Sequence, residues 1–336
     1  MNNTNMDSIA HISLAPMMDW TDRHFRYFLR QISPNTRLYT EMVTTGAIIH
    51  GEKDRFLRFN DDIEPYVALQ LGGADPGDLA RCAEIGQQYG YNEINLNCGC
   101  PSDRVQSGMF GACMMKAPDL VAQCVEAMQS ATDIPITVKC RIGVDEQDSP
   151  DFLFNFVDQS AQKGCKTFII HARKAWLKGL SPKENRTIPD LNYERVYSLK
   201  QKFPELEIIL NGGITSIPVI KDALKELDGV MIGREAYQNP YFFAEIEREI
   251  FGTEEIPSRE EIATRMIDYA RVQAQLYGTP VKSITRHILG LYHQQYGGKN
   301  WRRALSTLPY ETGADESVIQ KAIEIMALVE DNRIKA

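Results

Sequence analysis

Eight short runs of β-type residues alternate with spacers long enough for a helix, and this alternation constrains the fold more than any other feature. The runs lie at residues 12–17, 37–42, 66–71, 92–97, 136–141, 166–171, 207–211 and 229–233. Amphipathic segments between them include 76–89, 118–131, 152–163 and 218–226. Eight strand–helix repeats in about 240 residues are typical of a (β/α)8 TIM barrel rather than an open doubly wound sheet. No GxGxxG motif follows the first run, which excludes the simplest dinucleotide-binding fold.

The pattern changes after Pro240. Helices are expected at residues 242–251, 258–276, 279–296, 301–305 and 316–329, separated by glycine and proline. Ser258 followed by Glu261 predicts a capping box at the start of the second of them. We therefore expect an α/β protein with a TIM barrel over residues 1–240, followed by a C-terminal all-α helical bundle domain over residues 241–336.

The distribution of charge predicts an anionic partner. The chain has a net charge of −8, which argues against indiscriminate binding to nucleic acid. The charges are nevertheless segregated. Residues 269–310 include no Asp or Glu, and residues 163–202 include ten Lys or Arg against three acidic residues. Two separate basic segments in an acidic protein indicate that one face of it meets an anionic molecule.

Cysteine usage and hydropathy indicate the compartment. The seven cysteines, an odd number, lie between Cys82 and Cys165, which favours reduced thiols in a cytoplasm. No segment approaches the ~20 apolar residues of a membrane-spanning helix. The first ten residues have neither the basic region nor the apolar core of a signal peptide. We expect a cytoplasmic protein that does not interact with a membrane.

The segment from residue 93 to residue 115 is not explained by the fold alone. Its first half alternates apolar residues with Asn95 and Asn97, and each buried amide needs several hydrogen-bond partners. A loop with two thiols, Cys98 and Cys100, follows directly. These features favour a strand end that opens onto a site. Core packing of the thiols remains an alternative, and so does a metal set with later cysteines, although the spacings fit no usual zinc motif. We expect no metal.

Polar or unusual residues lie at the end of every expected strand. They are Pro16-Met17-Met18, Glu41-Met42, Gln70, Asn95 with Asn97, Lys139 with Arg141, His171 with Arg173, Asn211-Gly212-Gly213 and Gly233-Arg234. The active site of a TIM barrel is built from these carboxyl ends, and phosphate often binds after strands seven and eight. Glycine backbone N–H groups and an arginine fork suit a phosphate there. Together with Gln70, Lys139 and His171, such a phosphate site favours a flavin mononucleotide (FMN).

Several longer motifs extend over nearly the whole chain. They are Ala15-Pro16-Met17-Met18-Asp19-Trp20-Thr21-Asp22-Arg23-His24-Phe25-Arg26, Thr40-Glu41-Met42, Gln70-Leu71-Gly72-Gly73, Asn95-Leu96-Asn97-Cys98-Gly99-Cys100-Pro101-Ser102, His171-Ala172-Arg173 and Asn211-Gly212-Gly213. The fourth is highly specific, whereas the last alone is weak. The set resembles the tRNA-dihydrouridine synthases, and most closely the DusA subfamily that acts on uridines 20 and 20a of the D-loop.

The resemblance implies a role for each matching residue. The residues that would bind FMN are Pro16, Met17, Met18, Gln70, Lys139, His171, Asn211, Gly212, Gly213, Gly233 and Arg234. Cys100 would be the catalytic proton donor, and Asn97 would contact the target nucleotide. The residues that would orient tRNA are Lys183, Arg186, Lys299 and Arg302, which all lie in the two basic segments.

The resemblance also implies the reaction. NADPH or NADH would reduce FMN and leave, and tRNA would then bind. Hydride would pass from flavin N5 to C6 of the uracil, and a proton would pass from Cys100 to C5. An ordinary thiol, with a pKa of about 8.5, is mostly protonated near neutral pH and suits this role. The base must be flipped out of the D-loop to reach the flavin. We expect a monomer that needs no protein partner.

Two alternatives remain open. The first is another FMN barrel that reduces or oxidises a free pyrimidine, similar to dihydroorotate dehydrogenase. It would share the phosphate site, Lys139 and the loop thiol, but it does not account for the segment without acidic residues. The second is a tRNA-binding protein that has lost catalysis, which the presence of Cys100, Lys139 and His171 disfavours.

Overall fold

The structure is a computed structural model that describes residues 11–335. The chain forms two compact units. The first consists of the residues up to Asp19 together with Arg37–Gly233, and the second consists of Trp20–Thr36 together with Arg234–Ala336. The sequence analysis placed residues 20–36 with the barrel. The structure groups them with the C-terminal helices, because their one helix, α1 (Arg23–Ile32), packs against helices of the second unit.

The first unit is built on a sheet of eight parallel strands. The strands are β1 (His11–Leu14), β2 (Leu38–Thr44), β3 (Val67–Gly72), β4 (Glu93–Cys98), β5 (Ile136–Arg141), β6 (Thr167–His171), β7 (Glu207–Asn211) and β8 (Gly229–Ile232). Their order is β1-β8-β7-β6-β5-β4-β3-β2, and hydrogen bonds between Leu14 and Arg37 and between Arg37 and Ile12 join β1 to the start of β2. The expected (β/α)8 TIM barrel is therefore confirmed. The first strand is shorter than expected because Pro16 has no N–H to donate.

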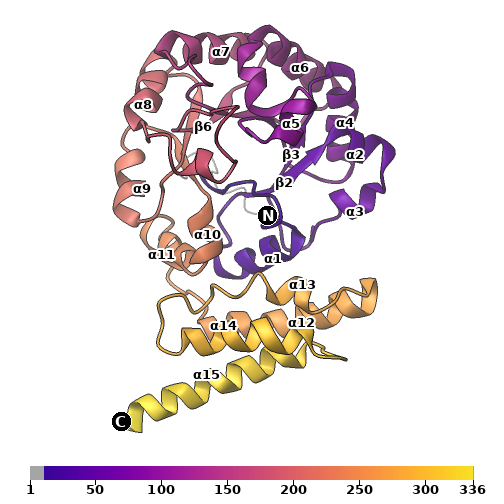
Figure 1. Cartoon of the computed structure of the whole chain (residues 1–336), viewed down its shortest axis with the longest axis vertical. Helices are drawn as coiled ribbons and strands as arrows, with labels where there is room; N and C mark the ends of the chain where they lie inside the picture. Colours follow the sequence, from indigo (N-terminus) through magenta and orange to yellow (C-terminus); the bar gives the residue numbers. More distant parts are fainter. Residues whose placement is uncertain (1–10, 336) are drawn as a thin grey trace. The chain divides into compact units, whose positions relative to one another are not determined.

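Helices surround the strands of this unit (Figure 1). They are α2 (Thr45–His50), α3 (Lys53–Leu57), α4 (Pro76–Gln88), α5 (Asp103–Ser107), η2 (Gly111–Lys116), α6 (Pro118–Ala131), α7 (Pro150–Gln162), η3 (Glu184–Arg186), α8 (Tyr193–Lys202) and α9 (Ile217–Ala223). Proline begins α4, α6 and α7, because proline has the backbone angle that a first turn needs. The expected segments 76–89 and 118–131 begin at these prolines, whereas α7 begins two residues before the expected segment 152–163.

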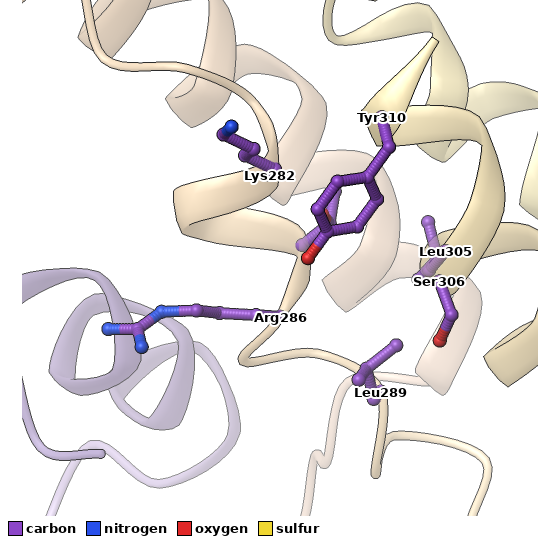
Figure 2. Close-up of a pocket in the computed structure, with 7 residues that line it drawn as sticks. Lys282, Arg286, Leu289, Leu305, Ser306 and Tyr310 are labelled. Carbon is purple, nitrogen blue, oxygen red and sulfur yellow. The ribbon is translucent and has the colours of Figure 1, made fainter. Parts of the chain in front are cut away.

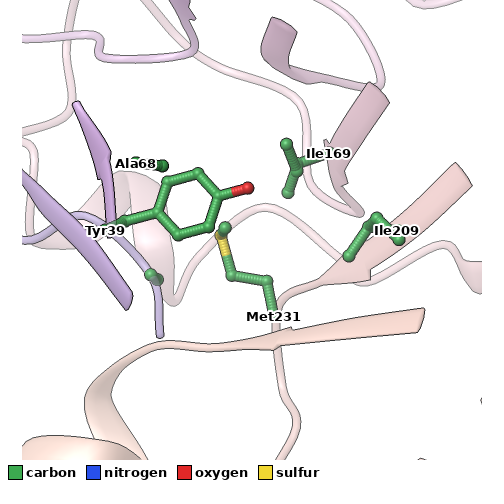
Figure 3. Packing of buried hydrophobic residues seen from close by; sticks show 6 residues of the cluster. Tyr39, Ala68, Ile169, Ile209 and Met231 are labelled. Atoms are coloured by element: carbon green, nitrogen blue, oxygen red, sulfur yellow. The ribbon is translucent and has the colours of Figure 1, made fainter. Parts of the chain in front are cut away.

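Side chains fill the interior of the barrel. Six of them form one buried cluster, with Met17 packed against it (Figure 3). The cluster consists of Ala15, Tyr39, Ala68, Ile169, Ile209 and Met231. The Tyr39 hydroxyl donates to the buried Glu93 carboxylate at 2.8 Å, and so does the Tyr66 hydroxyl at 2.8 Å. Because Glu93 begins β4, this buried carboxylate lies at the amino end of the strand, away from the expected site. Its partners satisfy it within the structural core.

The second unit is all-α. Its helices are α1, α10 (Arg234–Gln238), α11 (Phe242–Glu249), α12 (Arg259–Tyr277), α13 (Lys282–Thr285), α14 (Gly298–Thr307), η4 (Leu308–Tyr310) and α15 (Ser317–Lys335). The expected capping box forms at α12, where Ser258 and Glu261 each accept a backbone N–H. Met266, Tyr269, Ala270 and Gln273, which share one face of α12, are buried.

The prediction of a single helix over residues 279–296 is wrong. Only α13 forms there, and the chain continues as turns to α14. The carbonyl of Ile288 accepts from the Trp301 indole at 2.9 Å, and the carbonyl of Leu291 accepts from Arg259 at 2.9 Å. A Cβ on Gly290 would lie 2.9 Å from the carbonyl oxygens of Tyr237 and Gln238. The segment forms turns with local backbone hydrogen bonds, such as that from Leu291 N–H to the Ile288 carbonyl at 3.1 Å, and these tertiary contacts accompany them in place of a continuous helix.

Asp22 fixes the amino end of α1 within the second unit. Its carboxylate accepts from the backbone N–H groups of His24 and Phe25, and it also contacts Arg286 at 2.7 Å and His287 at 2.9 Å. Burial opposes ionisation of Asp22, but the contact with His287 and its neighbouring hydrogen bonds hold its pKa well below the usual range. One carboxylate thereby joins α1 to the turn after α13.

His24 gives the second unit a pH-dependent stability. Burial lowers the pKa of His24 to about 4, from an ordinary value of 6.5, although Asp22 opposes this. The unfolded chain therefore binds a proton at a pH where the folded chain does not, so stability is complete above pH 6.5 and falls as the pH drops from 6.5 towards 4. We expect a loss of about 1 kcal/mol between pH 7 and pH 5 from this residue, since its partial exposure limits the effect.

Urea unfolding at pH 7 and pH 5 measures this effect. The variant His24→Gln should lose less stability than the natural protein over this interval. Asp22 stays ionised throughout it and His287 is common to both proteins, so their difference isolates His24. Equal pH dependence in the two proteins would show that His24 does not couple folding to protonation.

Candidate functional site

Strand register brings the predicted polar residues to one end of the barrel. Gln70 lies beside Asn95, Asn97 beside Lys139, Arg141 beside His171, and His171 beside Asn211. All of them are at or near the carboxyl ends of β3 to β7. Parallel strands end at the same rim of a barrel. Neighbouring strands therefore bring an amide, an amine, an imidazole and a second amide to this rim.

Three amide side chains form a chain of hydrogen bonds below the rim. Asn95 is fully buried and accepts from Gln70 at 2.7 Å while donating to Thr137 at 2.8 Å. Asn97 donates to the Gln70 carbonyl at 2.8 Å. Its own carbonyl accepts from the backbone N–H groups of Gly99 and Cys100, both at 3.1 Å. The amides predicted from the sequence thus find their partners in one another and position the loop that follows.

Cys100 lies on this loop with its side chain half-exposed. Its thiol lies 3.5 Å from the Ser102 hydroxyl, to which it donates. The backbone carbonyl of Cys100 accepts from Ala112 at 2.9 Å, which closes the loop around α5. Gly111 allows this closure, because its φ is +77° and a Cβ there would lie 2.6 Å from the Cys100 oxygen. The loop therefore presents one thiol from a fixed backbone.

Cys98, two residues earlier, is different. It is buried, and burial raises its pKa well above the ordinary value. This burial agrees with core packing, which the sequence left open as one interpretation of the two thiols. Burial likewise raises the pKa of Cys140 to about 12 and that of Cys124 to about 11. No group of three or more His, Cys, Asp or Glu in residues 11–335 is placed to hold a metal ion.

Arg141 joins the Cys100 loop to the long loop after β6. Its Nε donates to the carbonyl of Gly99 at 2.8 Å. Its Nη1 donates to the carbonyls of Lys174 at 3.0 Å and Asn185 at 2.9 Å. The side chain is buried, and this burial lowers its pKa to about 10, so it remains a cation near neutral pH. Asn185 lies between Lys183 and Arg186, so one guanidinium fixes both the thiol loop and the loop predicted to orient tRNA.

A second link between the same loops comes from Gln106. Its Nε2 donates to the carbonyl of Pro101 at 2.9 Å and to the carbonyl of Leu177 at 2.8 Å. The sequence analysis did not assign a role to Gln106, Ser102 or Arg141. A role for Arg141 could have been predicted from the sequence, because it lies two residues after Lys139 and so on the same face of the strand. A charge on a buried strand face needs an ion pair or a full set of hydrogen bonds.

Lys139 is the amine of the site. Its Nζ donates to Asn211 at 3.0 Å, and the Asn211 amide in turn donates to the Met231 carbonyl at 2.8 Å. Burial lowers the pKa of Lys139 to about 8, and the charge of Arg141 acts in the same direction. An amine with this pKa exchanges its proton near physiological pH, which is typical of functional sites.

Glycine backbone lies next to Lys139 and His171. Gly212 and Gly213 have φ values of +109° and +71°, which other residues rarely adopt. A Cβ on Gly212 would lie 2.8 Å from the His171 ring, and one on Gly213 would lie 2.6 Å from Leu191. At Gly233 the only nearby atom would be the Cβ of Ala15, at 3.8 Å. Bare backbone at these strand ends is the arrangement that a phosphate group requires.

The remaining predicted cofactor residues lie at strand ends as well. Pro16, Met17 and Met18 follow β1 after Ala15, and Met18 is 56% exposed. Arg234 begins α10 in the second unit and is exposed. All four residues predicted to orient tRNA are exposed: Lys183 and Arg186 at η3, and Lys299 and Arg302 on α14.

Acidic side chains neutralise part of the two basic segments. Ion pairs join Lys163 to Glu126, Lys174 to Asp148, Lys200 to Asp228, Arg271 to Asp268 and Glu316, and Arg286 to Asp22. Lys282, Lys299, Arg302 and Arg303 form no ion pair with an acidic side chain of the described residues. Cations without an acidic partner among the described residues therefore lie on α13 and α14. Among residues 11–335, no helix has the length and apolarity to cross a membrane.

Comparison with known proteins decides the family. A model of the dihydrouridine synthase family matches residues 13–327. The chain belongs to the dihydrouridine synthase family. This match covers the barrel and nearly all of the helical unit of this dihydrouridine synthase. The predicted resemblance and the expected class of enzyme are thereby confirmed.

Curated relatives agree with the subfamily prediction. The tRNA-dihydrouridine(20/20a) synthase of Synechocystis sp. is 56% identical to this dihydrouridine synthase over 318 residues, which are 94% of this chain and 95% of that protein. The tRNA-dihydrouridine(20/20a) synthase of Escherichia coli K12 is 54% identical over 326 residues, 96% of this chain and 94% of that protein. That of Vibrio cholerae is 54% identical over 320 residues, 95% of this chain and 97% of that protein.

A solved structure shows the same fold at low sequence identity. A complex of 2-naphthoyl-CoA reductase matches 71% of this dihydrouridine synthase with a TM-score of 0.55 and 10% identity. The match spans half of that reductase chain. This likeness supports the barrel architecture and nothing further.

Proposed function

We propose that this protein reduces the C5–C6 double bond of uridine to dihydrouridine in the D-loop of tRNA, at positions 20 and 20a. The observation that supports this most strongly is the half-exposed thiol of Cys100 on a loop held by Asn97 and Arg141, beside Lys139 at the barrel rim. A proton donor, an amine and a phosphate cradle at one rim suit a flavin-dependent reductase, and membership of the dihydrouridine synthase family names the substrate.

FMN is the cofactor that we propose, with NADPH or NADH as the transient reductant. The bare backbone of Gly212, Gly213 and Gly233 suits its phosphate, and Asn211 and Arg234 directly adjoin these glycines in the chain. Gln70, Lys139 and His171 would face its ring, and Pro16 to Met18 would cover it. When bound, the flavin supplies the hydride that the reduction needs.

The chain's own residues would perform the remaining steps. Lys139, partly protonated near its pKa of about 8, would stabilise negative charge next to it. Asn97 would hold the backbone of the Cys100 loop and contact the target nucleotide from the same position. Cys100 would give its thiol proton to C5 of the uracil. The Asn97 Oδ1 accepts from the backbone N–H of Cys100, so this contact does not involve the sulfur, whose contact is the 3.5 Å hydrogen bond to Ser102.

Binding of tRNA would use the exposed cations of both basic segments. Lys183 and Arg186 belong to the loop that Arg141 ties to Cys100, and Lys299 and Arg302 lie one helical turn apart on α14. Such contacts to phosphates set the orientation of an RNA and give its binding a strong salt dependence. We propose that the protein acts in the cytoplasm as a monomer and requires no protein partner.

Mapping of dihydrouridine in tRNA tests the proposed function. Cells that lack this gene should lose dihydrouridine at positions 20 and 20a, and a plasmid copy should restore it at both. The purified protein should be yellow and should modify unmodified tRNA when supplied with NADPH. Loss at a different D-loop position would overturn the predicted position but not the chemistry. No change in the tRNA would overturn the proposal.

A further inference from the structure

The second unit has a cavity that the proposed reaction does not use. It has a volume of about 290 Å³ and lies between α13, the turn after it, α14 and η4. The lining residues are Lys282, Thr285, Arg286, Leu289, Leu305, Ser306 and Tyr310. Figure 2 shows Lys282 and Arg286 on one side of the Tyr310 ring, with Leu305 and Ser306 on the other. The cavity thus has a cationic side, an aromatic centre and an apolar floor.

All seven lining residues come from the segment without acidic residues, 269–310. The Lys282 ammonium lies 5.8 Å from the centroid of the Tyr310 ring, at the outer limit of a cation–π contact. It forms no ion pair with a described acidic side chain. A cation beside an exposed aromatic face, in a cavity without carboxylates, favours an anionic ligand that also has a planar ring.

Arg286, one of the two cations of the cavity, is held in place by an ion pair. One of its Nη atoms contacts Asp22 at 2.7 Å, and Asp22 is itself fixed by the first turn of α1 and by the buried His287. This contact uses one of the five N–H donors of the guanidinium. The ion pair therefore orients Arg286 and leaves donors for a phosphate at the cavity.

We propose that this cavity binds one nucleotide of an RNA chain, with its phosphate at Lys282 and Arg286 and its base stacked on Tyr310. The volume is near the lower end of small-molecule sites, about 300 Å³, which suits one unpaired nucleotide and excludes a base-paired segment. Stacking on an exposed aromatic ring beside a cation is the usual mode of binding to single-stranded RNA. The inference rests on the proposed function, since tRNA would supply this nucleotide, and it adds a contact distinct from Lys299 and Arg302.

Binding of unmodified tRNA to the full chain tests the site at several salt concentrations. Tyr310→Leu should weaken binding by roughly 5-fold or more, because it removes the stacking surface, whereas Tyr310→Phe should stay within about 2-fold. Lys282→Gln should lower the slope of log K against log[salt] by about 1, the contribution of one phosphate contact. Lys321→Gln, which removes an exposed charge from α15 of the same unit, is the matched control and should leave the slope unchanged.

The readouts separate this site from the proposed function. Nucleotide-resolved footprinting of the tRNA should lose protection at one or two nucleotides in Tyr310→Leu and at none in Tyr310→Phe. If the natural protein reduces tRNA while Tyr310→Leu and Lys282→Gln bind tRNA as it does, the nucleotide site is overturned and the proposed function stands. If the expected binding changes occur with a protein that reduces no tRNA, the site is supported and the proposed function is overturned.

Discussion

Replacement of Cys100 by alanine should reduce dihydrouridine formation by roughly 100-fold to 10,000-fold, the usual contribution of a positioned proton donor. The flavin should stay bound and NADPH should still be oxidised. The reason is that Asn97 holds the loop through the backbone N–H groups of Gly99 and Cys100, and the alanine variant retains both. Single-turnover measurement of dihydrouridine in tRNA, together with NADPH absorbance, checks both expectations.

Cys113→Ala is the matched control for this experiment. Cys113 is the other partly exposed cysteine, and its sulfur donates to the Phe110 carbonyl at 3.1 Å in the segment that closes the same loop. Its replacement should leave dihydrouridine formation within about 2-fold of the natural protein. Full tRNA reduction by Cys100→Ala would show that another group supplies the proton.

Replacement of Arg141 by methionine should have the second largest effect. It removes the donors to the carbonyls of Gly99, Lys174 and Asn185, of which the Asn185 hydrogen bond is buried and the other two are partly buried. A fully buried carbonyl that loses its partner costs about 1–3 kcal/mol, and a partly exposed one costs less because water can replace the donor. We expect a loss of roughly 2–4 kcal/mol in stability, together with a reduction of dihydrouridine formation by at least about 10-fold. Urea unfolding and tRNA turnover measure the two quantities, while the flavin content should change little.

A loss of stability alone would not distinguish Arg141 from other buried residues. The rate at which iodoacetamide alkylates Cys100 provides the second readout, since a released loop should change that rate. Arg195→Met is the control, because Arg195 also donates to a backbone carbonyl, that of Asp148, but does not join the Cys100 loop. Unchanged alkylation and turnover in Arg141→Met would contradict the positioning role.

The rim residues could be predicted from the sequence because a parallel barrel leaves little freedom. Once eight strands alternate with helices, each strand end must reach the same rim, and so Lys139, His171 and Asn211 become neighbours. Asn95 and Asn97 could be predicted for a second reason, because amides on a buried face of a strand require hydrogen-bond partners. These inferences depend on local pattern and on the closure of the sheet.

What could not be predicted depends on contacts between distant parts of the chain. Arg141 contacts carbonyls of Lys174 and Asn185, and no local pattern specifies which carbonyl a buried guanidinium will reach. The helix expected at residues 279–296 is interrupted because Gly290 packs closely against the backbone at Tyr237 and Gln238. Helical periodicity in that segment was real, but tertiary packing outweighed it.

The placement of α1 in the second unit has a consequence for synthesis of the chain. The ribosome makes residues 20–36 almost 200 residues before the rest of that unit begins at Arg234. At ~5–20 residues per second, the apolar face of α1 waits roughly 10–40 s for its partners. During this interval Phe25, Phe28 and Leu29, all fully buried in the finished protein, lack their final packing. The second unit therefore cannot complete its folding until the last hundred residues of the chain have emerged.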